Sequence, residues 1–180
     1  MSPEHLHLVT NHLPFLGLGL AMIPLVFGLL GRNRAALGSG LLIAFLCGWS
    51  VILVMSTGEE AYERYEHAGN YGISLDSGAE KWLETHEEDA HFFQPVFYIA
   101  AGTATVALML CIVGSRMVYP LSWIVFLLCG ASLACGILIA DSGGKIRRPD
   151  FRPGTSTGIL MESSPENLPD ALHGRFDVFS

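Results

Sequence analysis

The stretch AALGSGLLIAFLCGWSVILVMSTG, residues 35–58, decides the fold. It contains no Asp, Glu, Lys or Arg, and it is long enough for a helix to cross a bilayer, which takes about 20 residues. Three further stretches share this property, at residues 6–31, 92–115 and 117–140. Because four such stretches recur in one chain, a buried helix of a soluble core is a poor interpretation of them. The sequence therefore predicts four transmembrane helices.

The composition agrees with a membrane protein. Of the 180 residues, 51% are apolar and 15% are charged, which is unlike a soluble domain of this length. No Lys or Arg precedes the first stretch, so a cleaved signal peptide is not expected. The net charge of -7 comes mostly from one connection, which disfavours nucleic acid as a partner. The four cysteines fall inside the predicted spans, without a Cys-x-x-Cys pair, and are interpreted as packing residues.

Short links set the topology. Residues 31–34 join the first two spans and residues 114–116 the last two, so each pair forms an antiparallel hairpin. We expect an all-α, integral membrane up-and-down four-helix bundle over residues 1–141, with spans at about 8–30, 35–57, 92–115 and 118–140. Residues 142–180, rich in Gly, Pro, Ser and Asp, are expected to form an extended extramembrane tail.

The long connection, residues 59–91, is strongly acidic. It carries ten acidic residues against Arg64 and Lys81. Its start continues the second helix, and Ser77 to Glu80 has the spacing of a capping box that begins the next one. The arginines of the two short links favour a cytoplasmic position for both hairpin turns. We therefore expect a multi-pass protein of the bacterial inner membrane with its termini and acidic connection in the periplasm.

Nearly all polar motifs belong to one edge of the membrane, because the first and third spans begin there and the second and fourth end there. Six of the seven histidines lie at this edge. His12 and His91 begin spans one and three, which are usually diagonal in such a bundle, so their imidazoles could oppose each other and bind haem b. His5, His7 and His86 are interpreted as solvated helix ends.

Metal binding is a second possibility. Glu63 and His67 are four residues apart, as are Glu87 and His91, so mixed ligands share single helix faces. Three of His12, His67, His86 and His91 could also hold zinc. The third possibility is a polar cluster that ties the helix ends together without any cofactor. The candidate metal ligands are His12, Glu59, Glu63, His67, His86, Glu87 and His91.

Four motifs carry a resemblance to a known family: HLVTNHLP at 7–14 with Gly17, TGEEA at 57–61 with Glu66 and His67, ETHEEDA at 84–90, and GGKIRRPD at 143–150. Over residues 5–152 the chain resembles an uncharacterised family of small bacterial four-helix membrane proteins linked to respiratory or cytochrome systems. The resemblance implies functional roles for His12, Glu59, His86 and Glu87. The chain departs from the family pattern at two positions: Arg148 stands where the family usually has histidine, and Asp150 where it usually has glutamate.

Taken together, these features predict a membrane subunit of an electron-transfer, photosynthetic or respiratory assembly. We expect it to bind haem b through His12, His86 or His91, or a divalent metal ion, beside lipid and other membrane redox or pigment-protein subunits. The alternative is a cofactor-free structural accessory subunit. Enzymatic activity is less expected, since no nucleophile motif or phosphate loop is present.

Overall fold

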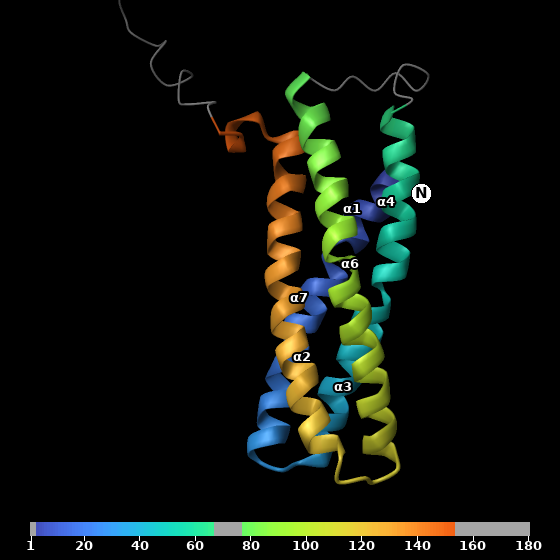
Figure 1. Ribbon diagram of the computed structural model, residues 1–180, viewed down its shortest axis with the longest axis vertical. Helices are drawn as coiled ribbons and strands as arrows, with labels where there is room; N and C mark the ends of the chain where they lie inside the picture. Colours follow the sequence, from blue (N-terminus) through green and yellow to red (C-terminus); the bar gives the residue numbers. More distant parts are fainter. Residues whose placement is uncertain (1–2, 67–76, 154–180) are drawn as a thin grey trace, which may run out of the picture.

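The computed structural model describes residues 3–66 and 77–153, and its regular structure there is entirely helical. The helices are α1 (Pro3–Thr10), α2 (Leu13–Leu30), α3 (Arg34–Trp49), α4 (Val51–Glu66), α6 (Ser77–Ile112) and α7 (Val118–Arg147), followed by a 3-10 turn, η1 (Pro149–Phe151). They form four up-and-down passes, of which α1 with α2 is the first and α3 with α4 the second (Figure 1). This confirms the all-α four-helix bundle.

Each pass is long and apolar enough to cross a membrane, over His5–Leu30, Arg34–Arg64, Gly78–Ile112 and Val118–Arg147. Large apolar side chains cover the outside of the bundle, with Phe27 67% exposed and Leu127 68% exposed. A water-soluble protein does not leave such a belt uncovered, whereas lipid tails solvate it. The chain is therefore a multi-pass membrane protein in contact with a bilayer.

The first two passes each contain a local break. A turn at Asn11 and His12 separates α1 from α2, and Pro14 lies in the first turn of α2, where its missing N–H costs no helical hydrogen bond. Ser50 separates α3 from α4. Pro24 and Pro95 lie inside α2 and α6, and both helices continue past them.

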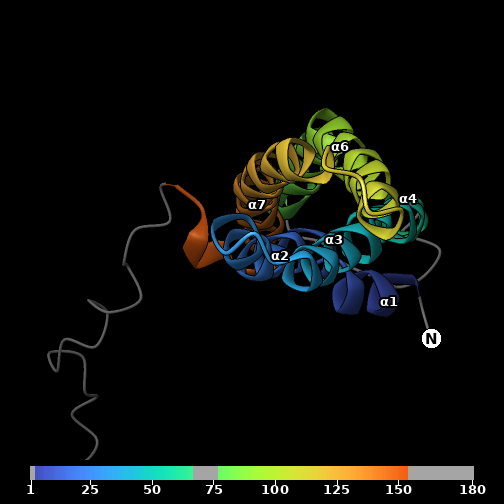
Figure 2. The ribbon, with the colours of Figure 1, turned by 90° about the horizontal axis from the view of Figure 1, so that it is seen from below.

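The helices pack in a ring in which α2 contacts α3 and α7, and α6 contacts the same two helices. The first and third passes are therefore diagonal, as Figure 2 shows from below. Small residues allow this close packing. A Cβ atom on Gly40 of α3 would lie 2.7 Å from Cγ and 2.9 Å from the backbone nitrogen of Leu25 in α2. Leu25 itself is fully buried in the apolar core.

At one end of the bundle the two hairpin turns are tied together. Asn33 caps α3, because its side-chain oxygen accepts hydrogen bonds from the backbone N–H groups of Ala35 and Ala36. The Arg34 guanidinium donates to the carbonyls of Gly114 and Ser115 at 2.6 and 2.7 Å, and the Tyr119 hydroxyl donates to the carbonyl of Arg32. These bonds hold both hairpins in register at this end.

The opposite end is longer than the hydropathy pattern indicated. Helix α7 continues to Arg147, beyond the expected end of the bundle at residue 141, and η1 follows it. Helices α4 and α6 extend into the acidic connection, to Glu66 and from Ser77, which confirms the continuation of the second helix and the helix start predicted at Ser77. Residues 67–76 of the connection and residues 154–180 of the tail lie outside the described residues, so the expected extended conformation of most of the tail stays a prediction.

Candidate functional site

A cavity of about 330 Å³ lies at the polar end of the bundle, between α1 and α4 on one side and α6 and α7 on the other. Its lining is mostly apolar. Phe15, Val51, Phe97 and Gly136 line the end that faces the membrane core. A pocket of this size and character, with a few polar groups that converge on it, is typical of a ligand site.

His7 enters the cavity from α1. Its Nδ1 lies 3.1 Å from the carbonyl oxygen of Val54 on α4, and the Thr57 hydroxyl lies 3.5 Å from the same nitrogen. Because a carbonyl can only accept, Nδ1 of His7 carries the proton and donates. In the neutral ring the lone pair is then on Nε2, the nitrogen that a metal would bind.

His86 enters from α6 in the same way. Its Nδ1 donates to the carbonyl oxygen of Ile139 on α7 at 2.9 Å, and the Ser142 hydroxyl lies 3.4 Å from that nitrogen. The hydroxyl of Ser142 donates to the same carbonyl at 3.0 Å. The Nε2 atom of His86 is thus also left with a lone pair, and both imidazoles have the tautomer of a metal ligand.

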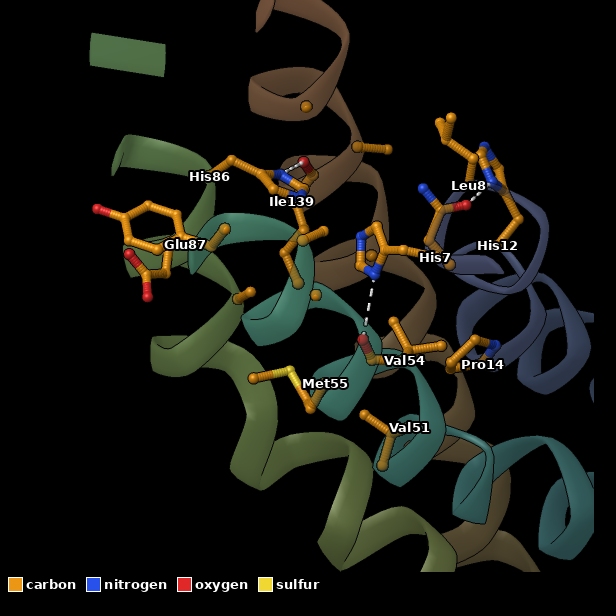
Figure 3. A pocket seen from close by; sticks show the side chains of 18 of the residues that line it. His7, Leu8, His12, Pro14, Val51, Val54, Met55, His86, Glu87 and Ile139 are labelled. Carbon is orange, nitrogen blue, oxygen red and sulfur yellow. Dashed lines mark hydrogen bonds between the residues drawn. The ribbon is translucent and has the colours of Figure 1, made fainter. Parts of the chain in front are cut away.

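The two imidazoles face each other across the cavity. Their ring centroids are 6.5 Å apart and their planes are nearly perpendicular, at 83°. Figure 3 shows the two rings beside each other at the cavity, with Leu8 and His12 beyond His7 and Glu87 beyond His86.

Two glycines make room for these rings. A Cβ atom on Gly58 would lie 3.0 Å from Cε1 of His7, and one on Gly143 would lie 3.0 Å from Cε1 of His86. Such distances are shorter than ordinary van der Waals contacts. Any side chain at either position would therefore press on the imidazole beside it.

The surroundings of the two histidines are copies of each other. His7 contacts a carbonyl, a hydroxyl residue three positions later and a glycine one position further, at residues 54, 57 and 58. His86 contacts the same three kinds of group at residues 139, 142 and 143. The match continues along the helices, since both histidines are followed five residues later by another histidine.

This repetition extends over the whole cavity wall. Adding 79 to the number of a lining residue in the first pass gives its counterpart in α6, as His7 gives His86. Adding 85 to the number of a lining residue in α4 gives its counterpart in α7, as Gly58 gives Gly143. The counterparts also line the cavity. The exceptions among the lining residues are Pro14, Leu83 and Phe97. The two hairpins are thus related by a pseudo-two-fold axis that runs through the cavity between His7 and His86.

The geometry fits a metal held between two imidazoles. A metal–imidazole bond is about 2 Å and a ring centroid lies about 1 Å behind its nitrogen, so bis-histidine ligation needs centroids roughly 6 Å apart. The observed separation is 6.5 Å. A flat macrocycle around the metal would lie between the two hairpins, against the apolar lining. The residues present therefore suit haem b.

The structure pairs His86, one of the three predicted haem ligands, with His7, which was not among them. His12 is exposed at the turn before α2, where its Nδ1 contacts the side-chain oxygen of Asn11. His91 is exposed and lies 3.9 Å from Glu87. Both line the cavity at its rim. The interpretation of His7 and His86 as solvated helix ends is wrong, because both rings are partly buried and hydrogen-bonded to carbonyls.

The other predicted metal ligands are spread out. Glu59 and Glu87 line the cavity, Glu63 is exposed on α4, and His67 lies outside the described residues. Within residues 3–66 and 77–153, no group of three or more His, Cys, Asp or Glu side chains is placed to hold a metal ion.

No family model, curated protein or solved structure matches the chain. The resemblance based on the four motifs therefore stays a prediction. The functional interpretation has to rest on the geometry of the cavity itself.

Proposed function

We propose that this chain is a membrane haem protein that binds one haem b, with His7 and His86 as its axial ligands, and takes part in electron transfer. The observation that carries the proposal is the opposed pair of imidazoles, each fixed by a carbonyl on the neighbouring helix. A ligand histidine in a metal site commonly donates its other ring nitrogen to such an acceptor.

The remaining residues of the cavity would position and insulate the group. The carbonyls of Val54 and Ile139 hold the two imidazoles in one tautomer and one orientation, which also makes the ligand nitrogens more basic. Phe15, Phe97 and Val51 exclude water from the side that faces the membrane core. When bound, haem supplies an iron that alternates between ferrous and ferric states and so carries one electron.

Electron transfer needs a donor and an acceptor. A haem held by both His7 and His86 would have no open coordination position for a substrate, which favours a carrier over an enzyme. We therefore infer that the chain works beside other membrane redox proteins, as a subunit of a respiratory or photosynthetic assembly. Co-purification of cytochromes or pigment proteins after mild detergent extraction would support this part of the proposal.

The test of haem binding is an optical spectrum of the protein purified in detergent from haem-supplied cells. We expect a Soret band and the sharp visible bands of a reduced low-spin haem. His7→Ala and His86→Ala should each abolish the low-spin spectrum, because either change removes one axial ligand. The matched controls are His12→Ala and His91→Ala, which alter rim histidines five residues later on the same passes and should leave the spectrum in place.

The proposal fails if the wild-type protein takes up no haem, or if His7→Ala and His86→Ala leave the spectrum unaltered. Loss of the spectrum in His12→Ala and His91→Ala instead would favour the pair suggested by the sequence. Elemental analysis of the same preparation addresses a bound divalent ion. Protein without haem and without metal would favour a cofactor-free accessory subunit.

A further inference from the structure

The cavity lining has two sides that differ in charge, which we call its two mouths. One is lined from α4 and α6, and the other from α1, the turn that follows it and α7. The pseudo-two-fold axis exchanges them, so each rim residue of one mouth has a counterpart on the other. Where two counterparts differ in charge, the protein could bind an asymmetric ligand in one orientation and not in the other.

The mouth between α4 and α6 is acidic. Glu59 and Tyr62 line it from α4, and Glu87 and His91 line it from α6. Glu59 is exposed, and Glu87 lies 3.9 Å from His91 in the next turn of its own helix. A carboxylate on a ligand would meet two like charges here, which disfavours its approach.

The mouth between α1 and α7 lacks both carboxylates and gains a cation. Leu8 stands at the position equivalent to Glu87, and Gly144 at the position equivalent to Glu59. Arg147 replaces Tyr62, and His12 corresponds to His91. The mouth between α4 and α6 is therefore acidic, whereas the mouth between α1 and α7 attracts anions.

Arg147 is suited to this role by what surrounds it. It is the last residue of α7, it is exposed, and it lines the cavity. The next residue, Arg148, is engaged with Asp150, whose carboxylate accepts from its Nε and Nη2 atoms at 3.0 and 2.9 Å. That hydrogen bonding also lowers the pKa of the Asp150 carboxyl. Lys145 is paired with Asp141. No such carboxylate partner is recorded for Arg147 among the described residues.

We propose that the mouth between α1 and α7 is an anion subsite in which Arg147 binds the carboxylates of the ligand, which for haem b are its two propionates. This inference rests on the proposed function and adds the orientation of the group in its slot. The propionate edge faces α1 and α7, and the apolar edge faces α4 and α6. An arginine guanidinium suits a carboxylate because its N–H groups form paired, charge-assisted hydrogen bonds.

The test compares haem with its dimethyl ester, in which both propionates are neutral. Protein prepared without haem supply is titrated with each compound in detergent, and affinity is read from the Soret band. The wild-type protein should prefer haem by roughly tenfold, the scale of one charge-assisted hydrogen bond at a partly exposed site. In Arg147→Gln this preference should disappear through weaker binding of haem, with binding of the ester unchanged. Arg148→Gln is the matched control and should retain the preference.

The outcomes separate the anion subsite from the proposed haem binding on which it rests. If both compounds bind through His7 and His86 and Arg147→Gln keeps the preference for haem, the anion subsite is wrong and the haem site stands. Equal weakening of both compounds in Arg147→Gln also contradicts the subsite. If neither compound binds to the wild-type protein, the proposed function fails and the subsite fails with it.

Discussion

A hydrogen bond to a main-chain carbonyl fixes both the orientation and the tautomer of an imidazole. His7 and His86 each have such a bond, and each ring also lies against a glycine that leaves no spare space. Gly58 and Gly143 therefore restrict the positions of the two rings, and through them the nitrogens that we propose as ligands. Groups that orient a metal ligand typically change metal affinity by about 10- to 100-fold when they are altered.

We expect Gly58→Ala and Gly143→Ala each to weaken haem binding by roughly tenfold. The new Cβ atoms would lie 3.0 Å from Cε1 and 3.2 Å or 3.1 Å from Nδ1 of the neighbouring imidazole, so the ring must shift and its bond to the carbonyl must lengthen. Titration of haem into each variant measures the effect.

Gly144→Ala is the control for these two variants, because it also changes a glycine in the cavity wall. Its Cβ atom would meet nothing closer than Cδ2 of Phe151 at 3.7 Å, which is ordinary contact. Haem affinity in this variant should equal that of the wild type. Equal affinities in all three variants would contradict a positioning role for Gly58 and Gly143.

The sequence located the polar edge but not the histidine pair, and the reason is local. Residues five apart on a helix lie about 140° apart around its axis, so His86 and His91 of the continuous helix α6 cannot both face the centre of the cavity. In the first pass the turn at Asn11 and His12 gives the same result, with His7 at the cavity and His12 exposed. The five-residue spacing of His7 and His12, repeated in His86 and His91, was a signal in the sequence that the two hairpins repeat each other, but it marks both histidine pairs equally.

At the scale of the helices, glycine determines how closely neighbouring helices approach. A Cβ atom on Gly40 would lie 2.9 Å from the backbone nitrogen of Leu25, which cannot move aside as a flexible side chain could. We expect Gly40→Ala to lower the free energy of unfolding by about 1–3 kcal/mol, the usual cost of overpacking a close-packed core. Reversible unfolding in mixed detergent micelles measures this change.

Gly102→Ala makes the same substitution in α6 at a position where a Cβ atom would have nothing within 4 Å. It should leave the free energy of unfolding within about 1 kcal/mol of the wild-type value, since only the intrinsic helix preference changes. If Gly40→Ala proves as mild as Gly102→Ala, close approach at Gly40 does not stabilise the contact between α2 and α3.

Hydropathy predicted the four passes well because each lipid-facing surface must be free of charge. The same signal cannot find where a helix ends in water. Helices α4, α6 and α7 therefore extend past the apolar stretches, to Glu66, from Ser77 and to Arg147. These extensions form the upper walls of the cavity, so the site lies partly in segments that hydropathy does not mark.

At the scale of the whole molecule, the two hairpins are parallel repeats related by an axis along the membrane normal, an arrangement known from other membrane proteins. The repetition is hard to see in the sequence because the spacings differ. His7 and Val54 are 47 positions apart, whereas His86 and Ile139 are 53 positions apart. The element that both hairpins share is a small set of contacts rather than a continuous stretch of sequence, so it becomes visible only in the folded bundle.

The orientation of the bundle determines which side of the membrane the cavity faces. The hairpin turns carry Arg32, Arg34 and Arg116, and the first hairpin usually dominates insertion, so the turns should be cytoplasmic. Lys145, Arg147, Arg148 and Arg152 after the fourth pass oppose this, but the first hairpin is given the greater weight because early helices usually dominate. We expect the cavity and the C-terminus to face the periplasm.

Reporter fusions test this orientation in a bacterial inner membrane. Alkaline phosphatase fused to the C-terminus should be active, because it folds only after export, and a green fluorescent protein there should be dark. The same two reporters fused after a truncation at Arg116 should give the reverse pattern, since that turn lies at the opposite edge of the bundle. A fluorescent C-terminal fusion would place the cavity on the cytoplasmic side, and electron donors and acceptors would then have to be sought there.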